Sequence, residues 1–211
     1  MTKRTTLTRA GSVIIIRVGV LSIQGGVSEH IHITNTVLNN SKIKGTCIPI
    51  KKKQELHDID ALILPGGESS TISKVLKQTG MFDVLQQRIK ENNLPIFGTC
   101  AGCVLLAHSL TIPSDNISLL QAMNMQVQRN GFGPQKKSFE HMISLKEFSQ
   151  PFPAVFIRAP IIKKVWGSCR ILAEINKTIV AVQQQNYLAL SFHPELTADT
   201  RFHQYFLDNI L

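Results

Sequence analysis

Short runs of apolar, often β-branched residues alternate along the chain with longer stretches of helical periodicity, and this rhythm predicts an α/β fold. The runs read VIIIRVGVLSI, TCIPI, ALILP, LPIF, AVFIRAP, ILAEI, TIVAV and YLALSF. The first four are almost continuously apolar, which is typical of strands buried on both faces of a parallel sheet. The later four indicate an antiparallel or mixed patch. Helices are predicted at about residues 27–39, 69–78, 81–92, 101–109 and 198–210.

The length of the chain suits one domain. It has 211 residues, with no internal repeat, linker or low-complexity segment. Residues 1–12 are polar and basic and are expected to form a flexible leader, so the predicted domain spans residues 13–211. A signal peptide is disfavoured, because Arg17 interrupts the apolar run and no small-residue cleavage site follows it.

Composition excludes several classes of protein. Hydrophobic residues make up 43% and charged residues 18%, and no window approaches the roughly 18 consecutive apolar residues of a membrane helix. Four cysteines in a chain of this length are too few for a disulfide framework. We therefore expect a soluble protein with reduced thiols, located in the cytoplasm and not associated with a membrane.

The net charge of +9 raises the question of a nucleic-acid partner. The basic residues are scattered, however, and the one dense run, Lys51, Lys52 and Lys53, has no aromatic residues interleaved. A solvated surface is the favoured interpretation, with a docking patch as the alternative. No nucleic acid is expected as a partner.

Four motifs each follow a predicted strand. Gln24-Gly25-Gly26 follows the first strand, Gly66-Gly67-Glu68-Ser69 follows ALILP, Gly98-Thr99-Cys100-Ala101-Gly102 follows LPIF, and His193-Pro194-Glu195 follows YLALSF. In open α/β sheets, ligands bind outside the carboxyl ends of the strands. We therefore expect these four segments to converge on one edge of the sheet.

The segment Gly98-x-Cys100-x-Gly102 has the layout of a nucleophile elbow, with cysteine in place of serine. The glycines permit a sharp turn and close packing of strand against helix. At a helix start, the dipole and free backbone N–H groups favour the reactive thiolate. Cys100 is thus the candidate nucleophile, and a buried structural cysteine at a tight turn is the alternative.

His193 and Glu195 are the candidate base and its orienting partner. They lie two residues apart, so their side chains point to the same side of an extended chain, and Pro194 biases His193 away from helix. His193 would take the thiol proton and later donate it to a leaving amine, while Glu195 would fix the imidazole tautomer. Alone, this tripeptide is more often a strand-end turn, and its weight comes from the elbow.

Acyl transfer also needs donors for a developing oxyanion. The backbone N–H groups of Gly67 and Ala101 are the candidates for this oxyanion hole. An ordinary strand-to-helix turn with Ser69 as the N-cap is the alternative for the paired glycines, and both interpretations can hold together.

The chain resembles the class I glutamine amidotransferases, and within them the glutaminase subunits of pyridoxal 5′-phosphate synthase. The segments that carry the resemblance run in family order over about residues 18 to 210. They are GVLSIQGGVSEH, LILPGGESST, PIFGTCAGCVLLA, QRNGFG followed by SFE, FIRAP, and SFHPELTADTRFHQYF.

This resemblance implies a flavodoxin-like α/β fold and a catalytic triad of Cys100, His193 and Glu195. It further implies that glutamine is held by the residues Gly67, Glu68, Ser69, Arg129, Ile157 and Arg158. No cofactor and no metal are expected. The ammonia would pass to a synthase subunit that makes pyridoxal 5′-phosphate, in a hetero-oligomer where a synthase dodecamer carries up to twelve glutaminase subunits.

The chain departs from the family pattern in one loop. The family usually reads RNxFGRQ with an acidic residue shortly before SFE, whereas this chain reads RNGFGPQKKSFE, with Pro134, Lys136 and Lys137. The triad residues are untouched, so this departure bears on the 129–140 loop and its contact with the synthase.

Other functions remain open at this point. The elbow and triad are shared with other glutaminase subunits, such as that of imidazole glycerol phosphate synthase, and a non-catalytic scaffold could keep the fold. Cys100 and Cys103 form a C-x-x-C that in a βα context can be a redox dithiol, although no second pair supports a zinc site. The histidines without an evident partner, expected at surface or structural positions, are His30, His32, His57, His108, His141 and His203.

Overall fold

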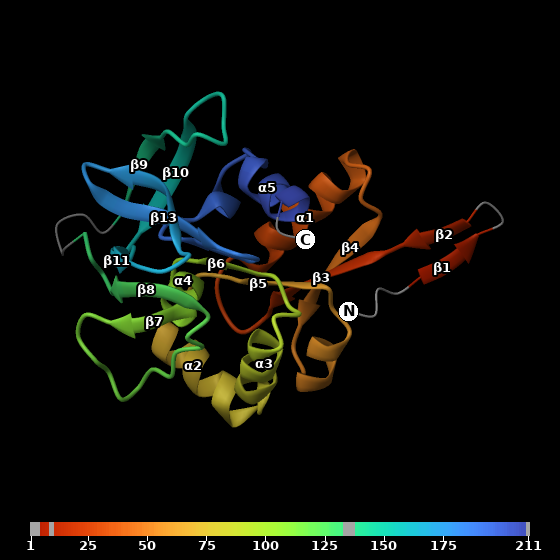
Figure 1. The fold of residues 1–211 in the computed structure, drawn as a ribbon, viewed down its shortest axis with the longest axis horizontal. Coiled ribbons are helices and arrows are strands. Elements are labelled where there is room, and N and C mark those ends of the chain that lie inside the picture. The colour runs from red at the N-terminus through yellow and green to blue at the C-terminus, as the bar shows by residue number, and fades with distance from the viewer. Residues whose placement is uncertain (1–4, 9–10, 133–137, 210–211) are drawn as a thin grey trace.

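The computed structural model describes residues 5–8, 11–132 and 138–209, and a ten-stranded mixed sheet runs through its centre (Figure 1). The strands of this sheet are β3 (Ile16–Leu21), β4 (Gly45–Ile50), β5 (Ala61–Leu64), β6 (Ile96–Thr99), β7 (Ala107–Leu110), β8 (Met123–Gln128), β11 (Ile161–Val165), β12 (Arg170–Ile175), β13 (Thr178–Gln184) and β14 (Tyr187–Leu190). Their spatial order is β4-β3-β5-β6-β14-β13-β11-β8-β7, and β12 pairs with β13.

The sheet has a parallel part and a mixed part. Strands β4, β3, β5, β6 and β14 pair in parallel, whereas β13, β11 and β8 follow in antiparallel pairs. The predicted parallel sheet and its later antiparallel patch are therefore confirmed.

Helices cover both faces of the sheet. They are α1 (Val27–Asn40), α2 (Ser69–Gln78), α3 (Met81–Lys90), α4 (Ala101–Leu106) and α5 (Arg201–Asn209). Leu76, Phe82 and Leu105 belong to a core under α2, α3 and α4, while Val37 and Phe206 belong to a second core under α1 and α5. All five predicted helices are confirmed, although α4 ends early because the chain continues directly as β7. None of the helices within the described ranges is long and apolar enough to cross a membrane.

Two smaller sheets complete the fold. Strands β9 (Ser138–Ile143) and β10 (Phe152–Ile157) pair antiparallel, and their inner residues join the core under α5. Strands β1 (Thr5–Thr8) and β2 (Gly11–Ile14) pair antiparallel and project from the body (Figure 1). The predicted boundary between a leader and a domain, after residue 12, falls within β2. This boundary stays a prediction.

The structure corrects part of the predicted strand pattern. Strand β4 is an edge strand with partly exposed residues, and it is not buried on both faces as expected. Pro49 fits this position, because proline lacks the N–H needed in a central strand. Strands β1, β7, β8, β9 and β11 were not predicted. Strand β8 reads MNMQVQ, an alternation of apolar and polar residues that matches its alternating burial and that the sequence analysis overlooked. Pro134, Lys136 and Lys137 lie outside the described residues.

Candidate active site

The four predicted motifs meet at one edge of the parallel sheet. Strands β3, β5, β6 and β14 are neighbours with the same direction, so their carboxyl ends lie together. Gln24, Gly66, Cys100 and His193 each follow one of these strands within a few residues. The expected convergence is confirmed, and it follows from the strand order.

Cys100 occupies a strained turn between β6 and α4. Its backbone φ is +50°, which is rare for a residue other than glycine, and its N–H donates to the carbonyl of Leu190 at 2.9 Å. Gly102 lies so close to the carbonyl of Leu64 that a Cβ atom would clash with it. The turn therefore has the geometry of a nucleophile elbow, held by the neighbouring strands.

His193 and Glu195 form a buried pair beside this turn. The imidazole Nδ1 lies 2.7 Å from Glu195 Oε1, and the two side chains are 11% and 0% exposed. Glu195 sits in a short 3-10 turn, η2 (Pro194–Leu196), and not in the extended chain that was expected. Pro194 fixes φ at the first position of that turn. His193 stays outside it, as predicted, with its N–H donating to the Val155 carbonyl at 2.8 Å.

The surroundings of His193 favour its charged form. Burial lowers the pKa of the imidazole, but the hydrogen bonds and charges of Cys100 and Glu195 outweigh it and raise the pKa to about 10. An imidazolium next to a thiol stabilises the thiolate. Cys100, His193 and Glu195 are thus linked in series, as a nucleophile, base and orienting carboxylate require.

Gly66 makes room for this contact. A Cβ atom at position 66 would clash with Cε1 of His193 and would lie 3.4 Å from Cβ of Cys100. A side chain there would push the imidazole away from the thiol. The strand-end glycine therefore has a steric role beyond forming a turn.

A small cavity opens in front of the cysteine. Its volume is about 180 Å³, below the range of about 300–1,000 Å³ found for larger ligands, so it suits a small metabolite. Its lining residues are Gly67, Glu68, Ser69, Cys100, Ala101, Val104, Arg129, Asn130, Ile157, Arg158, Pro160 and His193. All the predicted site residues except Glu195 line this cavity, and Glu195 lies behind His193.

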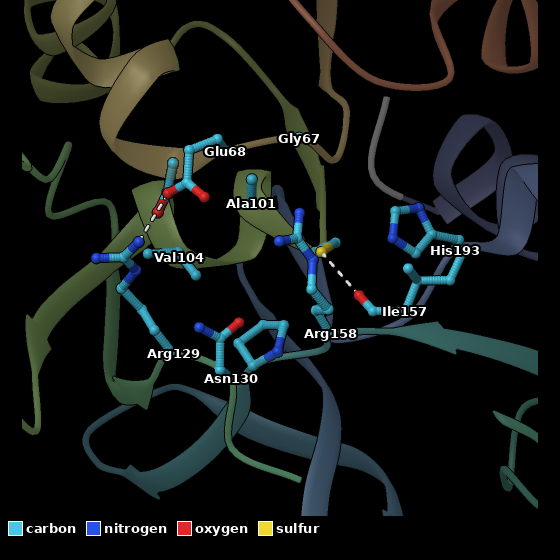
Figure 2. Close-up of a pocket in the computed structure, with 12 residues that line it drawn as sticks. Gly67, Glu68, Ala101, Val104, Arg129, Asn130, Ile157, Arg158 and His193 are labelled. Carbon is cyan, nitrogen blue, oxygen red and sulfur yellow. Dashed lines mark hydrogen bonds and ion pairs between the residues drawn. The ribbon is translucent and has the colours of Figure 1, made fainter. Parts of the chain in front are cut away.

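Charged side chains stand at the mouth of the cavity. Arg129 and Glu68 form an ion pair of 2.7 Å, and their side chains are 33% and 42% exposed. Figure 2 shows this pair on the side of the cavity opposite His193. Ser70 Oγ also donates to Glu68 at 3.2 Å. A guanidinium and a carboxylate at one mouth suit a zwitterionic ligand.

Backbone groups suited to an oxyanion line the same cavity. The N–H of Ala101 belongs to the first turn of α4, where intrahelical partners are lacking. Gly67 has a φ of +132°, and the following N–H, of Glu68, donates to Gln24 Oε1 at 2.9 Å. The loop after β5 is thereby tied to the loop after β3.

Ile157 and Arg158 reach the cavity from the end of β10. The carbonyl of Ile157 accepts a hydrogen bond from the Cys100 thiol at 3.9 Å (Figure 2). Arg158 has a φ of +42°. The N–H of Gly131 donates to the Ala159 carbonyl at 2.9 Å, so the loops carrying Arg129 and Arg158 are joined.

Comparison with known proteins shows the family in which this arrangement occurs. The sequence profile of the SNO glutamine amidotransferase family matches residues 20–211. The chain belongs to this family. The match includes every candidate residue of the cavity and leaves out only the segment before β3 and the start of that strand.

Individual relatives of this amidotransferase are similar to it in sequence over nearly their whole length. A pyridoxal 5′-phosphate synthase subunit PdxT from Staphylothermus marinus is 45% identical, covering 93% of this chain and 99% of that relative. The PdxT subunit from Brevibacillus brevis is 43% identical, covering 92% and 97%. A crystal structure of a glutamine amidotransferase superposes with a TM-score of 0.79 at 39% identity, covering 90% and 97%.

The alternative of a redox dithiol finds no support in this amidotransferase. Cys103 is fully buried, and burial, followed by the charges of Cys100 and Cys169, raises the pKa of its thiol strongly. A thiol held protonated in the core does not attack a disulfide. The C-x-x-C spacing reflects the first turn of α4.

Some residues at the site escaped the sequence analysis. Asn130, Val104 and Pro160 line the cavity, and only the fold brings them there. His30 and His203, which had no evident partner, are buried and contact each other at 2.9 Å. Histidines on apolar helix faces are the sequence signal that could have flagged this second pair.

Proposed function

We propose that the chain hydrolyses glutamine to glutamate and ammonia with Cys100, His193 and Glu195 as its catalytic triad. The observation that carries the proposal is the linked series of thiol, imidazole and buried carboxylate at the base of a small cavity. Membership of the SNO glutamine amidotransferase family supports the same reaction.

In the first half of the reaction, the thiolate of Cys100 attacks the side-chain amide carbon of glutamine. The N–H groups of Gly67 and Ala101 would stabilise the oxyanion. The imidazolium of His193 then gives its proton to the leaving nitrogen, the C–N bond breaks, and ammonia and a glutamyl thioester result. Glu195 holds the imidazole in the tautomer and orientation that this proton transfer needs.

In the second half, water replaces ammonia. His193, now neutral, takes a proton from the water, whose oxygen attacks the thioester carbon. The C–S bond breaks, glutamate leaves, and the thiolate and imidazolium are restored. Overall one glutamine and one water give one glutamate and one ammonia.

The mouth of the cavity would bind the amino-acid end of glutamine. Arg129 suits the α-carboxylate, because its planar guanidinium binds carboxylates with two hydrogen bonds, and Glu68 suits the α-ammonium group. Ser69, Ile157 and Arg158 would complete the contacts. Because Arg129 and Glu68 pair with each other at 2.7 Å, the ligand must either break this ion pair or bind to both side chains while they stay paired.

The ammonia would pass to a synthase subunit that makes pyridoxal 5′-phosphate. The support is the name PdxT carried by relatives that are 45% and 43% identical over nearly their full length. A cytoplasmic hetero-oligomer with up to twelve subunits of each kind, without nucleic acid, belongs to the same proposal. The same relatives disfavour service to imidazole glycerol phosphate synthase.

The test is glutamate release from glutamine, measured for the chain alone and with a pyridoxal 5′-phosphate synthase subunit. We expect activity that rises with the partner and disappears in Cys100→Ala. Cys169→Ala, which removes a buried thiol away from the cavity, is the matched control and should keep its activity. Equal glutamate release by wild type and Cys100→Ala under both conditions would leave a scaffold subunit as the function.

A further inference from the structure

Two buried histidines lie directly behind the triad. His30 on α1 and His203 on α5 are 0% and 1% exposed, and these two helices pack side by side (Figure 1). His30 Nδ1 lies 2.9 Å from His203 Nε2. His30 Nε2 lies 3.2 Å from Thr99 Oγ1 and 3.3 Å from Glu195 Oε2. A continuous polar chain therefore connects α5 and α1 to the carboxylate of the triad.

The second oxygen of Glu195 needs this neighbour. Oε1 is engaged by His193, whereas Oε2 is fully buried and makes no well-aligned hydrogen bond among the described residues. A buried carboxylate oxygen without a donor is costly. The N–H of His30 is the donor that the described structure offers it, and a small rotation of either side chain would align the two.

Hydrogen-bond accounting selects one tautomer for each histidine. If His30 carries its proton on Nε2, it donates toward Glu195 and Thr99, and its Nδ1 accepts from Nε2–H of His203. His203 Nδ1, which is buried without a partner among the described residues, then needs no acceptor. The opposite tautomers would turn a lone pair toward the carboxylate and leave a buried N–H unsatisfied.

Both rings are held neutral. The pKa of His30 lies well below its usual value because of burial, then the charges of His203 and His193, and burial lowers the pKa of His203 to about 3. The groups that face His30 are His203 from α5, Thr99 from β6, and His193 and Glu195 from the segment around η2. A neutral donor orients the carboxylate without neutralising its charge, which remains available to His193.

We propose that His30 is a positioning residue that holds Glu195 in line with His193 by donating its Nε2–H to the outer carboxylate oxygen, and that His203 fixes the tautomer of His30. The inference rests on the proposed glutaminase function and deepens it. Neither histidine lines the substrate cavity, so their effect passes through Glu195.

The experiment compares His30→Leu with His30→Gln in the full chain together with the synthase subunit. Leucine fills a similar volume without a donor, whereas the glutamine amide can place an N–H near the position of Nε2. We expect His30→Leu to lower kcat about 10-fold with KM within about 2-fold, by analogy with the loss of hydrogen-bond partners that orient metal-ligating residues. His30→Gln should recover most of kcat.

A spectroscopic readout separates positioning from packing. NMR titration of the His193 ring should show its pKa falling in His30→Leu toward the ordinary value, because a misaligned Glu195 no longer stabilises the imidazolium. His30→Gln should restore it. His32→Leu, on the exposed face of the same helix, is the control and should change neither kcat nor the titration.

His203→Leu provides a second test if His30→Leu does not fold. Without the Nε2–H donor, His30 is free to change tautomer, and we expect kcat to fall about 3-fold, the effect of losing one neutral hydrogen bond, with His203→Gln restoring it. If the wild type is active and the folded histidine variants keep both its kcat and its His193 titration, the positioning role is overturned and the proposed function stands. If the wild type releases no glutamate although the pKa of its His193 is raised as expected, the result counts against the proposed function instead.

Discussion

The two ends of the cavity are built in opposite ways. At the triad end, Cys100, His193 and Glu195 follow neighbouring strands of the sheet, and Glu195 is fully buried. At the mouth, Glu68 and Arg129 follow β5 and β8, which are not neighbours in the sheet, and their side chains are 42% and 33% exposed. The proposed catalytic residues are thus buried side chains on neighbouring strands, whereas the proposed ligand contacts are side chains with access to water that can move.

This contrast has an energetic side. Exposed ion pairs contribute only about 0–1 kcal/mol, because water and salt screen them, so the mouth can open at little cost. The buried pair of His193 and Glu195 sits in a medium of low polarity, where breaking one partner leaves an uncompensated group. Substitutions at the triad end should therefore affect kcat, and those at the mouth should affect KM.

The largest effect is expected for Glu195→Gln. The change keeps the shape but replaces the acceptor for His193 Nδ1–H with an amide, so the imidazole loses its correct tautomer. By analogy with the corresponding change in serine proteases, kcat should fall roughly 10³- to 10⁴-fold with KM nearly unchanged. Glutamate release assays measure this, with Glu174→Gln on the exposed side of β12 as the control. A KM effect larger than the kcat effect would place Glu195 at the substrate.

A smaller effect is expected at the mouth from Arg129→Ala. Loss of a charge-assisted contact of about 1.5–3 kcal/mol should raise KM about 10- to 100-fold and leave kcat within a few-fold. Arg129→Lys should recover only part of the loss, because lysine lacks the planar fork. Arg170→Ala removes an ion pair with Glu147 and hydrogen bonds to Gln183 and Tyr205, all away from the cavity, and should leave both constants unchanged. An unaltered KM in Arg129→Ala would remove this residue from the ligand site.

The smallest effect on activity is expected for Cys103→Ala. The side chain packs in the core behind the elbow, so the free energy of unfolding should fall by about 1 kcal/mol, measurable by denaturant titration. Glutamate release should stay within about 2-fold of wild type. A loss of activity comparable to that of Cys100→Ala would instead support the redox dithiol. The comparison between the triad end and the mouth of the cavity would then no longer hold.

The elbow, and the three other motifs that lie beside it in space, could be predicted from the sequence alone. Strand ends in a parallel sheet share one edge, so Gln24, Gly66, Cys100 and His193 could be brought together from strand order without coordinates. Helices α1, α2, α3 and α5 were also predictable, because each presents a periodic apolar face to the core, whereas the six residues of α4 are all buried and were located by the elbow that precedes them. The position of Arg129 after β8 was implied only by resemblance, because β8 itself was not recognised as a strand.

Sequence by itself determined the α/β class, the five helices and the four motifs at the sheet edge, since these depend on local periodicity and on backbone-permissive glycines. The tertiary structure decided that β4 is an edge strand, that Arg129 meets Glu68, and that His30 and His203 stand behind Glu195. Those contacts join residues up to 173 positions apart. The contacts of the two histidines are set by the packing of α1 and α5 on one face of the sheet, and the pair of Arg129 and Glu68 by the positions of β5 and β8; no local pattern encodes either.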